Sequence, residues 1–192
     1  MYESMGCTLD EDLESCVKRN LITDTEFKRP LQSGYLTSWP GPRIISGIVG
    51  TTHHGLDMSN YGAAYTDYAV YPIANGKVID VLINYNCGGR MVYIEHNING
   101  TLYTSAYWHL RRVDVSKGDV VTFDTQIGIM GGTESWDKCT TGAHLHLELS
   151  LSKISSSSNI ISAARANWLE PQKYVNFPKK LYESWSNRTR RY

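Results

Sequence analysis

Short runs in which apolar and polar residues alternate fill the middle of the chain, from Pro42 to Leu151. A period of two is typical of β-strands, whose successive side chains point to opposite faces. The clearest predicted strands are Gly76–Ile83, Arg90–His96 and Thr101–Trp108. Between the last two, Asn97–Gly100 has the composition of a hairpin turn. This part of the chain is therefore expected to be all-β.

Two further regions extend the β pattern. Val113–Gly118, Val120–Val121 and Gln126–Met130 predict another pair of hairpin strands, with Lys117–Asp119 at a turn. Ala143–Leu151 alternates most regularly. In a strand, His144 and His146 share one face with Glu148. The opposite face is expected to belong to the core, with Leu145, Leu147 and Leu149.

The two ends of the chain differ from this β region. Thr8–Glu11 fits a capping box, so a helix is expected from there towards Arg19. Ser38–Pro42 is a run of structure breakers that marks a boundary. Past the polar, serine-rich loop after Leu151, a short helix is expected at Ile160–Trp168.

These features divide the chain into three predicted parts. A helical N-terminal extension occupies residues 1–34, a folded domain residues 35–176, and a basic tail residues 177–192. From Lys179 to Tyr192 the tail has five basic residues and one acidic residue. Such a tail is usually a solvated end, and a docking role is the alternative.

Composition and charge narrow the class of protein. The 192 residues are 41% hydrophobic and 20% charged, and the formal net charge is zero. Nothing in this balance favours nucleic acid or an anionic membrane as partner, and no run reaches the roughly 18 apolar residues of a membrane helix. The first residues lack the basic and apolar regions of a signal peptide. If the protein is secreted, we expect a removed signal, a longer parent protein or delivery by a phage particle.

Four cysteines, Cys7, Cys16, Cys87 and Cys139, allow three pairing schemes. None stands in a C-x-x-C arrangement, which disfavours thioredoxin-like and zinc-ribbon folds. The even number favours disulfides and an extracytoplasmic compartment.

Histidine spacing suits metal chemistry at several places. His53 and Asp57 are four residues apart, so in an extended chain they point the same way, as do His144 and His146. A catalytic zinc needs three His, Asp or Glu ligands and an open position for water. A neighbouring histidine then transfers the proton. The helical H-E-x-x-H motif is absent, and the spacing of the other motifs alone does not distinguish ligands from structural histidines.

Three segments resemble the signature motifs of the lysostaphin-type metallopeptidases, in the same order along the chain. They are H-H-G-L-D (His53–Asp57), Y-W-H-L (Tyr107–Leu110) and T-G-A-H-L-H-L-E (Thr141–Glu148). The stretches Pro72–Val78, Val92–Gly100, Val115–Val120 and Ile127–Gly131 are also similar to the family. The resemblance extends over about Leu36 to Tyr174.

This resemblance implies a mainly β fold, an antiparallel β-sheet groove of the lysostaphin, barrel-sandwich-hybrid-like type with short helical N- and C-terminal extensions. It places a metallopeptidase domain at residues 35–176. The implied activity is zinc-dependent hydrolysis of peptide bonds in the stems or cross-bridges of bacterial peptidoglycan, with one Zn²⁺ per chain. We expect a secreted monomer that acts at the cell wall.

The resemblance also implies roles for single residues. His53, Asp57 and His146 would bind zinc. His109 and His144 would be catalytic, as general acid or base and as stabilisers of the oxyanion, and the division of these roles stays open. His54 is expected to point away from the metal and His96 to be structural. Glu148 either orients a zinc ligand or is a buried structural carboxylate.

Departures from the family pattern concern the walls of the groove. The stretch Met58–Tyr71 is longer than expected, and its tyrosines would either contact substrate or pack: Tyr61, Tyr65, Tyr68 and Tyr71. Cys87 follows a predicted strand, and Cys139 precedes the third motif. A Cys87–Cys139 disulfide would tie two groove-lining loops together.

Three other interpretations are less favoured. A non-catalytic peptidoglycan-binding or regulatory relative should lack at least one of the five site residues, and all five are present. A biotinyl or lipoyl carrier domain needs an exposed lysine in a characteristic hairpin motif, which Lys117 lacks. A structural zinc site needs four ligands, and three good ones are visible.

Overall fold

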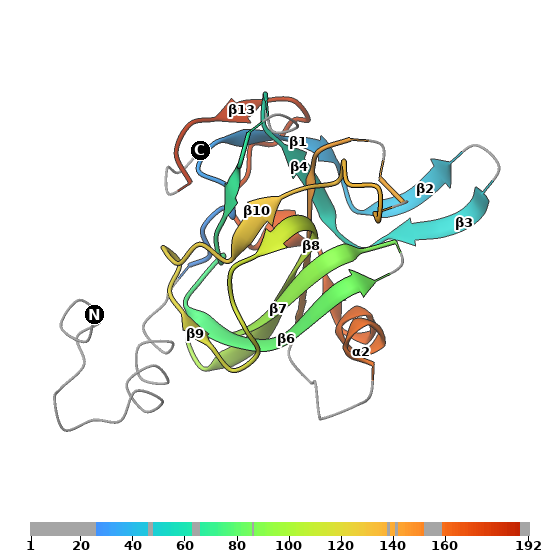
Figure 1. Ribbon diagram of the computed structural model, residues 1–192. Helices are drawn as coiled ribbons and strands as arrows, with labels where there is room; N and C mark the ends of the chain where they lie inside the picture. The colour runs from blue at the N-terminus through green and yellow to red at the C-terminus, as the bar shows by residue number, and fades with distance from the viewer. Residues whose placement is uncertain are drawn as a thin grey trace, which may run out of the picture.

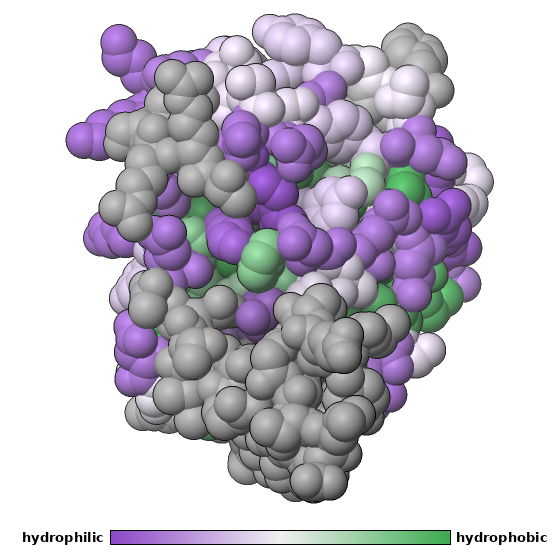
Figure 2. Space-filling model, turned by 90° about the vertical axis from the view of Figure 1, so that its left-hand side faces the viewer, coloured by the Kyte–Doolittle hydropathy of each residue, from purple (hydrophilic) through white to green (hydrophobic). Residues whose placement is uncertain are grey.

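The computed structural model describes residues 26–45, 48–62, 66–85, 87–137, 139–140, 142–151 and 159–188. The predicted helix after Thr8, together with Cys7, Cys16 and Tyr65, lies outside the described residues. None of the helices among these described residues has the length and hydrophobicity that a membrane-spanning helix needs. The face shown in Figure 2 is mostly hydrophilic where it is coloured, with small apolar areas between polar side chains.

Antiparallel strands dominate the fold (Figure 1), as the predicted fold class requires. Among the described residues, one 11-stranded sheet has the main order β13-β1-β4-β11-β8-β7-β6-β9, and β2 and β3 pair separately in a projecting hairpin. The first strands are β1 Gly34–Ser38, β2 Gly41–Ile45, β3 Ile48–His53, β4 Leu56–Ser59, β5 Ala69–Val70, β6 Gly76–Tyr85 and β7 Gly89–Ile98. The later elements are β8 Thr101–Val113, β9 Val120–Val121, β10 Gly128–Met130, β11 Leu145–Leu151, helix α2 Ile160–Ala166, β12 Trp168–Leu169, the 3-10 helix η2 Pro171–Lys173 and β13 Ser184–Trp185.

The three clearest predicted strands are present as β6, β7 and β8, each longer than expected. The turn between β7 and β8 also follows the prediction. Ile98 pairs with Thr101, and both central residues have positive φ, 51° at Asn99 and 84° at Gly100. This is the backbone of a type I′ turn, which favours Asn-Gly because other residues are strained there.

The predicted hairpin pair between Val113 and Met130 is confirmed only in part: Val113 pairs with Gly128, and Asp114 donates to the Ile127 carbonyl at 3.0 Å, but Val120–Val121 has a different partner. β9 pairs with β6, and β10 pairs with β5 and β8. The turn at Lys117–Gly118 does form, but Gly118 donates a hydrogen bond to the Val78 carbonyl and Val78 donates to the Asp119 carbonyl. These bonds attach the turn and β9 to β6, so this middle part of the predicted hairpin forms long-range pairs instead of local ones.

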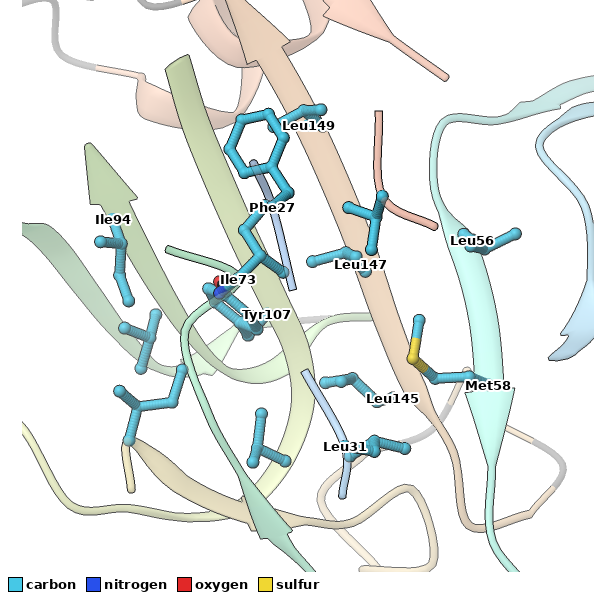
Figure 3. Packing of buried hydrophobic residues seen from close by; sticks show 14 of the residues in the cluster. Phe27, Leu31, Leu56, Met58, Ile73, Ile94, Tyr107, Leu145, Leu147 and Leu149 are labelled. Carbon is cyan, nitrogen blue, oxygen red and sulfur yellow. Dashed lines mark hydrogen bonds between the residues drawn. The ribbon is translucent and has the colours of Figure 1, made fainter. Parts of the chain in front are cut away.

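The two faces of the sheet bury different side chains. On one face, the main core contains Val92 and Ile94 of β7, Tyr107 of β8 and the alternate leucines of β11. Figure 3 shows the predicted core leucines of β11, Leu145, Leu147 and Leu149, in a row beside Leu56 and Met58 of β4. On the other face, Tyr93 and Trp108 pack against Ile160, Ile161 and Ala164 of α2.

Segments on both sides of the predicted domain also reach this core. Phe27 and Leu31 are buried in it, as is Trp185 of β13. The Trp185 indole donates to the Leu31 carbonyl at 3.1 Å, and Arg188 donates to the Arg29 carbonyl at 2.8 Å. The predicted domain boundaries at residues 34 and 176 stay predictions. The segments outside these boundaries nevertheless pack directly against the main core.

Candidate metal centre

Three side chains from three strands meet at one point. His53 ends β3, Asp57 lies in β4, and His146 lies in β11 directly opposite Asp57 in the strand register. Asp57 Oδ1 lies 3.0 Å from His53 Nε2 and 2.9 Å from His146 Nδ1, and the two ring nitrogens are 2.9 Å apart. These three buried residues form a group that could hold a metal ion.

The spacing and chemistry of this group fit zinc. Nitrogen and carboxylate ligands at about 2.0–2.2 Å from a tetrahedral zinc lie about 3.3 Å from one another. The three donor atoms here are separated by 2.9 to 3.0 Å. A small outward adjustment of the side chains would admit the ion.

Gly55 allows the chain between His53 and Asp57 to lie close to His146. A Cβ atom built on Gly55 would collide with the imidazole ring of His146 and come within 2.8 Å of the Leu147 carbonyl oxygen. The glycine of the H-H-G-L-D motif is therefore required by space, because the chain between His53 and Asp57 passes directly against β11.

The charges of the group are arranged around the Asp57 carboxylate. Burial opposes its ionisation, but hydrogen bonds from His146 and His53 hold the pKa of Asp57 far below its ordinary value. Burial alone would lower the pKa of His146, but hydrogen bonds to Asp57 and Glu148 raise it overall. The centre thus presents one carboxylate charge shared by two imidazoles, a charge distribution that attracts a cation.

Arg43, on the projecting hairpin, supplies a cation at this centre. Its Nη2 donates a hydrogen bond to Asp57 Oδ2, lies 3.1 Å from His53 Nε2 and donates to Ser38 Oγ at 3.1 Å. The guanidinium therefore contacts two of the three candidate ligands.

Glu148 fixes the other nitrogen of His146. Its Oε1 lies 3.1 Å from His146 Nε2 and accepts hydrogen bonds from Arg165 Nη2 at 2.9 Å and Arg165 Nε at 3.2 Å. Burial raises the pKa of Glu148, but the contacts with His146 and Arg165 outweigh this and lower it overall. Carboxylate partners of this kind orient metal-binding histidines.

A bulge in β8 turns His109 towards the centre. Arg90 pairs with Leu110 and Val92 with Tyr107, so β8 has one extra residue between these pairs. His109 has φ 63°, which few non-glycine residues adopt. Without the bulge, alternation after Trp108 would direct His109 into the main core. With it, the His109 and His144 rings lie 4.6 Å apart between centroids.

The environments of these two histidines differ. Burial lowers the pKa of His144, the Asp57 charge partly opposes this, and His109 adds to the lowering. His144 therefore favours the neutral form. His109 Nδ1 lies 2.7 Å from Oδ2 of the buried Asp137.

The site lies in a groove of about 910 Å³. All five predicted site residues line it, together with Arg43, Trp108, Arg165, Tyr35, Tyr182, Cys87 and Cys139. The predicted Cys87–Cys139 disulfide is present, with 4.7 Å between the Cα atoms. It therefore joins two segments of the groove wall, as expected.

The remaining histidines lie apart from the candidate ligands. The His54 ring packs edge-on against Trp168, with centroids 5.7 Å apart. His96 is fully buried and contacts the Asn75 carbonyl at 2.8 Å and the Ser105 hydroxyl at 2.7 Å, consistent with a structural role. Of the loop tyrosines, Tyr61 is 77% exposed, whereas the Tyr68 hydroxyl donates to the Ser33 carbonyl at 2.7 Å.

Three residues at the site were not found from the sequence: Arg43, Asp137 and Arg165. Arg43 and Arg165 lie on elements outside the three motifs, and neither has a distinctive spacing from a histidine. Asp137 precedes Cys139 by two positions, and this spacing alone does not indicate that Asp137 contacts a histidine. Only the folded chain brings them to the groove.

Comparisons with known proteins agree with this geometry. Residues 51–158 match the profile of peptidase family M23. Peptidoglycan DD-endopeptidase ShyB of Vibrio cholerae serotype O1 is 32% identical over 124 residues, which cover 62% of this chain and 26% of that protein. The matched part of this chain therefore spans about a quarter of the length of that relative.

Two solved structures are also similar. A zinc-containing peptidase from Vibrio cholerae has a TM-score of 0.58 and 26% identity, over 81% of this chain and 41% of that one. The catalytic domain of lysostaphin from Staphylococcus simulans has a TM-score of 0.53 and 26% identity, over 74% of this chain and 90% of that one.

A mainly antiparallel β-sheet of lysostaphin type, with a His-Asp-His group in a groove, defines the class as a metallopeptidase fold. Because the family match spans more than half of the 192 residues, the chain belongs to peptidase family M23.

Proposed function

We propose that this protein is a zinc-dependent endopeptidase that hydrolyses peptide bonds in the stems or cross-bridges of bacterial peptidoglycan. One observation carries the proposal: the donor atoms of His53, Asp57 and His146 converge in a groove beside the paired rings of His109 and His144. Three ligands with an adjacent acid–base pair are the elements that a hydrolytic zinc site requires.

His53, Asp57 and His146 would hold the metal. When bound, zinc supplies a Lewis acid that lowers the pKa of water to about 7 and polarises a carbonyl group. Of the adjacent pair, one histidine accepts the proton of the attacking water and returns it to the leaving amine. The other donates a hydrogen bond to the oxygen on which negative charge develops.

Two features support a substrate outside the cytoplasm. The related ShyB is a peptidoglycan DD-endopeptidase by name. The Cys87–Cys139 disulfide is a bond that persists in oxidising compartments. We therefore assign the protein to the cell wall, where peptidoglycan is its partner, and expect it to act as a monomer.

The test is incubation of the zinc-loaded protein with purified peptidoglycans of several cross-link types, followed by mass spectrometry of the released fragments. New amino and carboxyl ends from at least one wall type, abolished by a chelator, are the expected result. If zinc binds at one equivalent and no wall type yields fragments, the protein is instead a wall-binding or regulatory member of the family.

A further inference from the structure

We propose that Asp137 is a positioning residue for His109 and that the Cys87–Cys139 disulfide holds Asp137 and the Gly88 carbonyl against it. This inference rests on the proposed function, because it assigns His109 a proton-transfer role. It concerns a carboxylate and a disulfide outside the three sequence motifs.

The first observation is the contact between the two side chains. Asp137 Oδ2 lies 2.7 Å from His109 Nδ1, and both residues are only 6% exposed. The carboxylate accepts the Nδ1 proton, so the neutral imidazole keeps its free lone pair on Nε2. Asp137 thus fixes the tautomer in which Nε2 can accept a proton, and its charge stabilises the imidazolium that forms.

The second observation is that the His109 backbone is hydrogen-bonded on both sides. The His109 N–H donates to the Gly88 carbonyl at 3.0 Å, and the His109 carbonyl accepts from Gly131 N–H at 2.8 Å. These bonds secure the bulged, positive-φ conformation that aims the ring at the groove. A residue in a rare conformation persists when its surroundings over-determine it.

The disulfide connects these two contacts. Cys87 precedes Gly88, and Cys139 follows Asp137 by two positions. The segments also touch next to the bridge, since a Cβ on Gly89 would lie 2.6 Å from Asp137 Oδ2. One covalent bond therefore joins the segment that binds the His109 backbone to the segment that binds its ring.

The primary test is Asp137→Asn. The amide carries no charge to stabilise an imidazolium, and its NH₂ group can donate to Nδ1 and so favour the opposite tautomer. We expect kcat on peptidoglycan to fall about 10²-fold or more with KM nearly unchanged. Zinc content and the unfolding midpoint should stay close to wild type. Asp114→Asn, which neutralises a carboxylate paired with Arg112 away from the groove, is the matched control and should keep full activity.

A second readout does not depend on activity. Two-bond ¹H–¹⁵N spectra of the labelled full chain report the tautomer of each histidine, and His109→Gln assigns the signal. We expect the Nδ1–H tautomer in the wild type and its loss in Asp137→Asn, or in Asp137→Ser if the first variant does not fold. A wild-type tautomer and kcat in the variant would overturn the assignment. The expected tautomers in a protein that cleaves no wall would leave the positioning intact and refute the proposed function instead.

The disulfide is tested by the double variant Cys87→Ser/Cys139→Ser, which leaves Cys7 and Cys16 unchanged. We expect kcat to fall by about 10-fold or more with one zinc retained, because small misplacements of an acid–base group are costly. Unchanged kcat would show that the Gly88 and Asp137 contacts hold without the bridge.

Discussion

At the residue scale, the proposed zinc site is built from side chains that are adjacent only after folding. Both ring nitrogens of His146 have a carboxylate partner, Asp57 at one and Glu148 at the other. Removing it leaves two of the three donor atoms, and Asp57 and Glu148 each lose one hydrogen-bond partner.

We therefore predict that His146→Ala abolishes both zinc retention and activity. Metal content after dialysis, measured by mass spectrometry, checks this. His54→Ala is the matched control, because His54 lies beside His53 in sequence but packs against Trp168. Retention of one tightly bound zinc by His146→Ala would remove His146 from the ligand set.

His109→Ala should separate zinc binding from turnover. His109 is outside the His-Asp-His group but lies on the groove next to His144. We expect zinc to remain bound while kcat falls by about 10² or more, the usual effect of losing a general acid or base. Loss of the metal in this variant would contradict the assignment.

For Arg43 we predict that substitution increases the affinity for zinc. Its guanidinium and a divalent cation would compete for Asp57, since Arg43 Nη2 donates to the Asp57 carboxylate and lies 3.1 Å from His53 Nε2. Arg43→Gln should therefore bind zinc about 5-fold or more tightly, as expected when a nearby like charge is removed. Competition with a chelating dye measures the dissociation constant, and weaker binding would mean that Arg43 supports the centre.

Sequence spacing predicted part of this centre. Alternation in β11 correctly placed His146 opposite the leucine face, because a strand has a period of two. His109 could not be placed in the same way. The bulge that redirects it depends on pairing with β7 and β10, neither of which is local to Tyr107–Leu110.

At the scale of elements, structure that is determined locally was again easier to predict than long-range strand pairing. The Asn99–Gly100 turn was predictable because its two residues determine the hairpin locally. The pairing of β10 with Val113 was predicted, but the pairings of β9 with β6 and of β10 with β5 were missed, because such short strands carry little pattern of their own.

The contribution of the C-terminal segment to stability can be tested directly. Trp185 of β13 is 2% exposed, packs in the main core and donates to the Leu31 carbonyl. We predict that Trp185→Ala lowers the free energy of unfolding by about 3–5 kcal/mol. Urea denaturation measures it, with Tyr182→Ala as a control that is 64% exposed. A loss below about 0.5 kcal/mol would be typical of an exposed tail residue.

At the scale of the whole molecule, burial of His96 should make stability depend on pH. Burial lowers the pKa of His96 from 6.5 to about 4, so between these values the unfolded chain binds more protons than the folded one. Stability therefore rises from pH 4 to pH 6.5 and is lost as the pH falls through this window, by about 3 kcal/mol from this group.

The variant His96→Gln should show a smaller decrease in unfolding free energy between pH 6.5 and pH 4 than the wild type. The pKa values of Asp57 and Glu148 are also lowered, but both residues are retained in the variant, so comparing the two proteins cancels their contributions. Parallel pH curves would indicate that His96 is protonated in the folded state or is not buried.

The central claim joins one metal ion to one hydrolytic reaction in the groove. The most direct measurement is a titration of the metal-free protein with zinc while fragment release from a susceptible peptidoglycan is followed. Activity that rises linearly and reaches a plateau at one equivalent of zinc per chain is the predicted result. Full hydrolysis without added metal, or no hydrolysis of any wall type once one equivalent is bound, would contradict a zinc endopeptidase built on His53, Asp57 and His146.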